Sequence, residues 1–79
     1  MNTNLINQIE IVFCNVMGIP KDKLTDSIAY NSYPLWDSLK HLQLISELEE
    51  EFDIEFSMED VVLMKNLELV KKLVGKYLV

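Results

Sequence analysis

The stretch Trp36-Asp-Ser-Leu-Lys-His-Leu-Gln-Leu-Ile-Ser-Glu-Leu-Glu-Glu-Glu-Phe52 decides the fold of this chain. When its residues are placed at steps of about 100°, as in an α-helix, the apolar residues gather on one side. That side collects Leu44, Ile45, Leu48 and Phe52. The stretch therefore predicts an amphipathic helix from about Ser38 to Phe52, with one side buried in a hydrophobic core.

Two leucines of this predicted helix do not belong to its core side. Leu39 and Leu42 fall away from the centre of that side, toward the polar arc. The start of the helix has two candidate caps, Asp37 and Ser38, because both side chains accept hydrogen bonds from unpaired N-terminal N–H groups. A capping role does not exclude a second task for Ser38.

Helical spacing continues on both sides of this stretch. The N-terminal segment repeats apolar residues at intervals of four, three and four: Leu5, Ile9, Val12 and Val16. Gly18 is a natural stop for that helix, Ser57 opens a short helix with a sequence like a capping box, and Asn66 caps a last one. We expect an all-α bundle of four helices, three longer and one short, in a single domain over residues 1–79.

A long connection, residues 18–37, separates the first two predicted helices. A loop of about 20 residues is unusual in a compact domain and is often functional. Its apolar residues indicate that it lies on the core: Leu24, Ile28, Tyr30, Tyr33, Leu35 and Trp36. For Trp36 we favour packing against the bundle, because a Trp buries a large area; the alternative is a place on a binding surface.

The net charge of −6 is unevenly distributed. Residues 37–60 hold nine acids and one lysine, whereas residues 61–79 carry a charge of +3. A negative field of this strength repels nucleic acid and anionic membranes and steers basic proteins inward. We therefore expect partners with basic docking surfaces, and neither nucleic-acid binding nor membrane insertion.

The composition also bears on location and assembly. Residues 1–17 lack the basic start and the cleavage site of a signal peptide, and the chain has a single cysteine, Cys14. These features predict a cytoplasmic protein. Cys14 lies among apolar residues and is expected to be a small buried residue, not a reactive thiol. We expect the protein to be a monomer.

An active site of the chain's own is not expected. A nucleophilic serine needs a base within reach and a group that orients the base. His41, the single histidine, lies three residues after Ser38, but Asp37 is not spaced to orient its imidazole. No glycine-lined elbow surrounds Ser38. We interpret His41 as a partly exposed helix residue near the edge of the core.

No dedicated metal site is expected either. Residues 53–60 place oxygen-bearing side chains at alternate positions, as a calcium loop does. However, Met58 stands where such a loop needs glycine, and Met64 where it needs glutamate. No Cys/His cluster and no glycine-rich phosphate loop occur in the sequence.

Ser38 is better explained as a residue that other enzymes modify. A serine at the start of a helix lies beside unpaired backbone N–H groups and the positive end of the helix dipole, and both stabilise an anion. A phosphate ester on Ser38 would suit that environment.

The segment Asp37-Ser38-Leu39 at the start of a helix, followed by Leu48-Glu-Glu-Glu-Phe-Asp-Ile-Glu-Phe56, resembles the acyl carrier protein family. The resemblance extends over essentially the whole chain. It implies that Ser38 carries a 4′-phosphopantetheine arm, which a phosphopantetheinyl transferase moves from coenzyme A with magnesium. The arm ends in a thiol that holds acyl groups as thioesters. The protein would then be a carrier and not an enzyme.

The resemblance also implies a set of partner-binding residues. Asp37 would assist the encounter with the transferase, Leu39 and Leu42 would touch partner enzymes, and Glu49 and Glu50 would meet basic residues on the enzymes that load and process the acyl group. Fatty-acid-synthesis carriers tend to have acids just after the serine, where this chain has Lys40, His41 and Gln43. Lys40, His41 and Gln43 are therefore predicted to tune the choice of partner.

A further departure is Trp36, which replaces a small residue before the aspartate. Hydrophobic residues there are familiar from stand-alone carriers of specialised pathways, so we hypothesise a dedicated carrier. Two alternatives stay open. The cargo could be an aminoacyl or peptidyl group on the same fold, or the chain could be an unmodified acidic helical adaptor.

Overall fold

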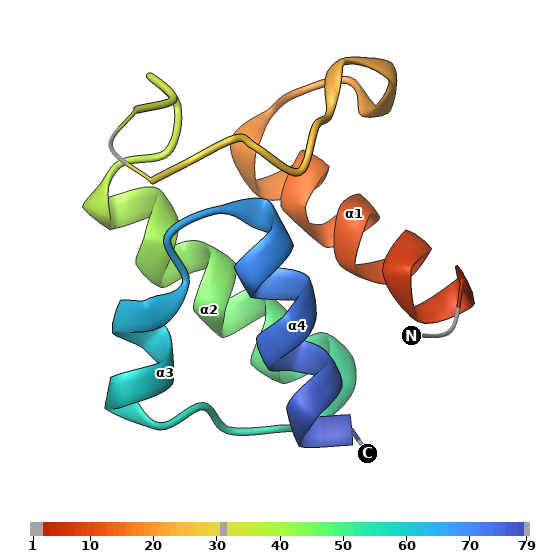
Figure 1. The fold of residues 1–79 in the computed structure, drawn as a ribbon, viewed down its shortest axis with the longest axis vertical. Coiled ribbons are helices and arrows are strands. Elements are labelled where there is room, and N and C mark those ends of the chain that lie inside the picture. The colour runs from red at the N-terminus through yellow and green to blue at the C-terminus, as the bar shows by residue number, and fades with distance from the viewer. Residues whose placement is uncertain (1–2, 31, 79) are drawn as a thin grey trace.

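The computed structural model describes residues 3–30 and 32–78 (Figure 1). Within these ranges the chain forms α1 (Thr3–Met17), a 3-10 turn η1 (Lys21–Lys23), α2 (Ser38–Phe52), α3 (Met58–Leu63) and α4 (Leu67–Leu78). The predicted all-α fold is confirmed, with three long helices, one short helix and a long connection between α1 and α2. The predicted bounds of α2 agree with the structure.

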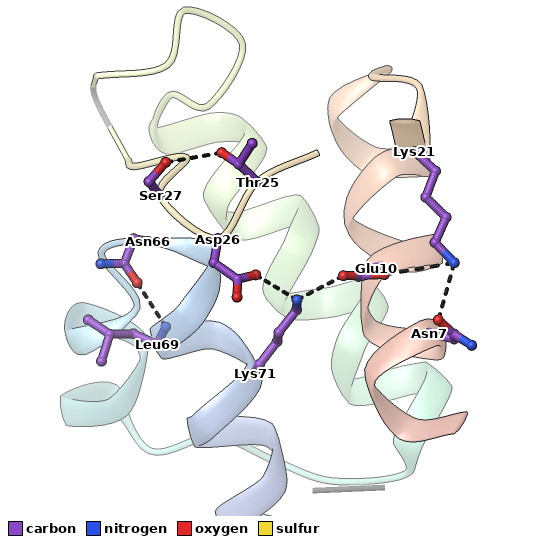
Figure 2. Close-up of polar contacts among 9 residues, drawn as sticks. All are labelled: Asn7, Glu10, Lys21, Thr25, Asp26, Ser27, Asn66, Leu69 and Lys71. Atoms are coloured by element: carbon purple, nitrogen blue, oxygen red, sulfur yellow. Dashed lines mark hydrogen bonds and ion pairs between the residues drawn. The ribbon is translucent and has the colours of Figure 1, made fainter. Parts of the chain in front are cut away.

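Three of the helices, α2, α3 and α4, begin at polar residues that the sequence indicated. Asp37 caps α2, and its Oδ1 accepts a 2.9 Å hydrogen bond from the Lys40 N–H. Ser57 Oγ accepts the Asp60 N–H at the start of α3, and Asn66 Oδ1 accepts the Leu69 N–H in the first turn of α4 (Figure 2). These bonds satisfy backbone donors that a helix start leaves without partners.

Gly18 ends α1 as expected. Its φ of +70° lies in the left-handed region that favours glycine, and the Cys14 carbonyl accepts hydrogen bonds from the N–H groups of Gly18 and Ile19. Asp53 does the same for α2, with a φ of +54° and its N–H bonded to the Glu49 carbonyl. Asp tolerates this conformation better than most residues.

One hydrophobic core joins the helices and the connection. Its buried residues are Ile9, Val12, Phe13, Val16, Met17, Ile19, Trp36, Leu44, Ile45, Leu48, Phe56, Met64, Leu67, Val70 and Val74. Trp36 is fully buried and meets Phe13 of α1 edge-on, with ring centroids 5.1 Å apart. The packing interpretation of Trp36 is therefore confirmed.

The connection between α1 and α2 lies on the core, as most of its apolar residues predicted, and it pairs with the segment that leads into α4. The prediction is wrong for Leu35, which is 45% exposed. Ala29 and Asn66 form an isolated antiparallel bridge. The Tyr30 N–H donates to the Lys65 carbonyl at 2.9 Å, and the Leu67 N–H donates to the Ile28 carbonyl at 3.0 Å. This pairing fixes the loop that delivers the chain to the start of α2.

Lys71 of α4 holds the same loop from inside the bundle (Figure 2). Its Nζ lies 2.6 Å from Asp26 Oδ1 and 2.8 Å from Glu10 Oε2, and its side chain is only 11% exposed. Burial by itself would lower the pKa of Lys71, but the hydrogen bonds from its ammonium to Asp26 and Glu10 outweigh it and raise the pKa. Lys71 thus joins α1, the loop and α4.

Replacing Lys71 by Met should lower the free energy of unfolding by about 1–3 kcal/mol, because charged hydrogen bonds to two carboxylates are lost. Lys72→Met is the matched control, since Lys72 pairs with Glu68 at 3.7 Å between exposed side chains. That variant should stay within about 0.5 kcal/mol of the parent. Urea unfolding measures both, and equal losses would contradict the role of Lys71.

Asp60 anchors α3 to α4. Its Oδ2 accepts hydrogen bonds from the Tyr77 hydroxyl at 2.6 Å and the Lys76 ammonium at 2.9 Å. The Tyr77 oxygen in turn accepts the Ser57 N–H at 2.9 Å. Hydrogen bonds from Tyr77 and then Lys76 hold the pKa of the Asp60 carboxyl below its ordinary value.

A carboxyl with a lowered pKa stabilises the fold above its ordinary pKa, and this contribution is lost as the pH falls through the lowered value. Asp60→Asn should therefore melt below the parent at neutral pH, and the difference should shrink below about pH 4. Thermal melts across pH test this, with Glu55→Gln, at an exposed position, as the control. A difference that persists unchanged in acid would overturn the assignment.

Candidate functional site

Ser38 is the first residue of α2, and its side chain is exposed. The structure decides between the two candidate caps, because Asp37 supplies the oxygen that accepts the Lys40 N–H. The Asp37 carbonyl also accepts the His41 N–H at 2.9 Å. Capping is therefore carried by Asp37, and Ser38 is an exposed residue at the positive end of the helix dipole.

His41 lies beside this turn and makes two side-chain hydrogen bonds. Its Nδ1 accepts the indole N–H of Trp36 at 3.0 Å, and its Nε2 lies 2.9 Å from the Val61 carbonyl in α3. The imidazole is half-buried, and its plane lies 27° from that of the Trp36 ring. The predicted place at the edge of the core is confirmed, and both ring nitrogens are engaged in contacts within the fold.

Lys40 also bonds within the fold. Its Nζ donates to the Val16 carbonyl at 3.1 Å, in the last turn of α1. A cation there stabilises the negative end of the α1 dipole. Lys40 therefore ties the start of α2 to the end of α1, which gives its departure from the acidic family pattern a structural reason. Its predicted effect on partner choice stays a prediction.

Of the other predicted partner residues within α2, all but Glu49 are exposed. Leu39 and Leu42 are 72% and 64% exposed, and Gln43 and Glu50 are exposed as well. Glu49 is half-buried, and its Oε2 accepts the Phe56 N–H at 2.8 Å. Glu49 thus shapes the turn between α2 and α3, while its docking role stays a prediction.

Sequence reasoning missed an apolar surface on α3. Met58, Val62 and Leu63 are 81%, 70% and 50% exposed. The α3 helix lies beside α2, to which it is joined by His41 and the Val61 carbonyl. A signal was available: a six-residue helix cannot turn all of its apolar side chains toward one core.

Cys14 is half-buried against the core, where burial foremost, and then the charge of Glu10, raise the pKa of its thiol. Across residues 3–30 and 32–78, no cluster of three or more His, Cys, Asp or Glu side chains is arranged to hold a metal ion. Over the same ranges, no helix has the length and apolar character needed to cross a bilayer.

The fold and the site define a class of protein: a small helical domain that presents one exposed serine at the first residue of an acidic helix. Comparison with known families agrees, because residues 7–74 match the family model described as "Phosphopantetheine attachment site". The chain belongs to this family of carrier proteins, which are not themselves catalysts.

Two curated proteins give the comparison finer detail. Both are named "Acyl carrier protein" and come from Brachyspira hyodysenteriae, one of them from strain ATCC 49526 / WA1. Each is 32% identical to this chain over 74 residues, which cover 92% of this chain and 95% of the relative. The chain is therefore a homologue of acyl carrier proteins over nearly its full length.

Proposed function

We propose that this protein carries acyl groups on a 4′-phosphopantetheine arm attached to Ser38. The observation that carries this assignment is the exposure of Ser38 at the first residue of α2, where Asp37 performs the capping. When bound, the arm supplies a terminal thiol that holds acyl groups as thioesters.

The residues at the start of α2 suit the phosphodiester of such an arm. A helix N-terminus stabilises negative charge through its backbone N–H groups and dipole. In loading, Ser38 Oγ gives up its proton to the transferase and bonds to the phosphorus next to the pantetheine of coenzyme A. The phosphorus releases the nucleotide part of coenzyme A. Asp37 keeps the turn closed through its bond to the Lys40 N–H.

A loading reaction tests this assignment. The protein is incubated with coenzyme A, magnesium and a broad-range phosphopantetheinyl transferase, and its mass is measured. We expect a gain of one phosphopantetheine that disappears in Ser38→Ala and persists in Ser46→Ala, a control at an exposed serine of the same helix.

The outcomes separate the alternatives. No gain with several transferases would favour an unmodified acidic adaptor. A gain that persists in Ser38→Ala would place the arm on another residue. The mass of the form loaded in its native cell would distinguish an acyl from an aminoacyl or peptidyl cargo.

We further propose that partner enzymes dock on the outer sides of α2 and α3. Leu39, Leu42, Met58 and Val62 offer exposed apolar area on these two neighbouring helices. Exposed Glu50 and Gln43 lie on the same helix as the leucines. Apolar contacts inside a charged rim are common at protein interfaces, and the acids of α2 would steer basic enzymes toward them.

Leu42→Ala and Glu50→Lys should lower kcat/KM for the transferase about three- to tenfold, through lost apolar contact and lost charge attraction. Their melting temperatures should stay near that of the parent, because both side chains are exposed. Glu68→Lys makes the same charge change on exposed α4 surface and should load normally. Equal losses in Glu50→Lys and Glu68→Lys would mean that only net charge matters.

The proposal that this carrier serves a dedicated pathway rests on the sequence. Trp36, Lys40, His41 and Gln43 depart from the fatty-acid-synthesis pattern, and these departures support a carrier dedicated to a specialised pathway. Near-normal support of fatty-acid elongation by this protein would count against that preference. A cytoplasmic location and a monomeric state remain predictions.

A further inference from the structure

Three hydrogen bonds close the turn that presents Ser38, and each joins a residue before Ser38 to a residue after it. Asp37 Oδ1 accepts the Lys40 N–H at 2.9 Å, and the Asp37 carbonyl accepts the His41 N–H at 2.9 Å. Trp36 Nε1 donates to His41 Nδ1 at 3.0 Å. The first two bonds are those of an ordinary capped helix, whereas the third depends on two particular side chains.

Trp36 and His41 lie at two defined positions relative to the start of α2. With Asp37 as the cap, Trp36 is the residue before it and His41 is the fourth residue of the helix. A contact between these positions fixes the angle at which the chain approaches a helix. Here the two rings are joined at their edges by the hydrogen bond, with centroids 5.8 Å apart and planes 27° apart.

Both side chains are anchored to the rest of the fold. Trp36 is fully buried, with Phe13 at 5.1 Å and Tyr30 at 6.1 Å between ring centroids. His41 reaches the Val61 carbonyl of α3. The turn around Ser38 is therefore braced against α1 and the loop on one side and against α3 on the other.

The bonds also fix the tautomer of His41. An indole N–H can only donate, so His41 Nδ1 accepts and carries no proton. The hydrogen of the neutral imidazole then lies on Nε2, which donates to the Val61 carbonyl 2.9 Å away. The two residues also need each other, because a buried indole N–H without an acceptor is costly.

We propose that Trp36 and His41 are positioning residues for the loading of Ser38. Neither touches the phosphopantetheine; they hold the Asp37 turn so that Ser38 Oγ is already oriented when the transferase binds. Orientation in advance lowers the cost of reaching the reactive geometry. This inference rests on the proposed attachment at Ser38.

Two variants remove the bond. Trp36→Phe keeps an aromatic ring against Phe13 but loses the indole N–H, and His41→Leu loses the acceptor. We expect kcat for loading to fall about five- to tenfold in both, the equivalent of one lost hydrogen bond. The KM for the carrier should change little, because Leu39, Leu42 and Glu50 are untouched.

Two further variants separate positioning from general stability. His41→Asn places an amide oxygen near the position of Nδ1 and should restore much of kcat. Val74→Ala opens the buried core of α4, where Val74 is fully buried, and should lower the melting temperature with kcat unchanged. All variants are assayed at a temperature at which circular dichroism shows them folded.

A spectroscopic measurement tests the pair without loading. The chain has one histidine and one tryptophan, so their side-chain ¹⁵N signals are assigned to residues without ambiguity. At neutral pH we expect an imidazole with hydrogen on Nε2 and an indole N–H that exchanges slowly with solvent. Hydrogen on Nδ1 would overturn the pair, as would fast exchange of the indole N–H.

Failure of the positioning role and failure of the proposed function give different results. If the parent protein is not loaded at Ser38, the proposed function fails while the spectra still decide whether the pair exists. If the parent is loaded and Trp36→Phe and His41→Leu keep the parental kcat, the positioning role is wrong. It is also wrong if Val74→Ala loses kcat to the same extent.

Discussion

The burial of Trp36 is the constraint on which the rest of this structure depends. The side chain is fully buried, yet the next residue but one is an exposed serine. From that place the indole meets Phe13 of α1, Tyr30 of the loop and His41 of α2, and His41 extends the contact to α3. Because Trp36 is buried while Asp37 and Ser38 are exposed, the chain leaves the core at the turn around Asp37. The start of α2 is thereby fixed relative to α1, the loop and α3.

The charged side chains of the protein fall into two groups, one bonded within the fold and one exposed on α2. Lys71 and Lys76 form ion pairs with Asp26, Glu10 and Asp60 within the fold. Lys40 bonds to a carbonyl at the end of α1. These three lysines hold helices and loops together, while Glu47, Glu50 and Glu51 on α2 stay exposed. The acidic field over α2 is therefore directed at solvent, where it acts on approaching proteins.

The sequence was sufficient for the helices and for the outward leucines, because helical periodicity is a local property. It placed α2 from Ser38 to Phe52 and separated Leu39 and Leu42 from the core. It could not choose between Asp37 and Ser38 as the cap, since both residue types cap helices. The contacts of Lys40 with Val16 and of Ala29 with Asn66 join residues far apart in the chain. Such contacts depend on how the helices pack, which periodicity does not specify.

The hydrogen-bonded pair of Trp36 and His41 is a contact at the site that helical periodicity did not specify. In the sequence each residue was a separate departure from the family pattern, and each had its own explanation. In the structure they are one unit, because the buried indole needs an acceptor and His41 provides it.

The imidazole of His41 also bonds to the Val61 carbonyl of α3, a six-residue helix too short to be stable alone. At its other end α3 is held through Ser57 and Asp60 by Tyr77 and Lys76. The turn that presents Ser38 and the helix with the exposed Met58 and Val62 thus share one side chain, so that whatever displaces His41 acts on both.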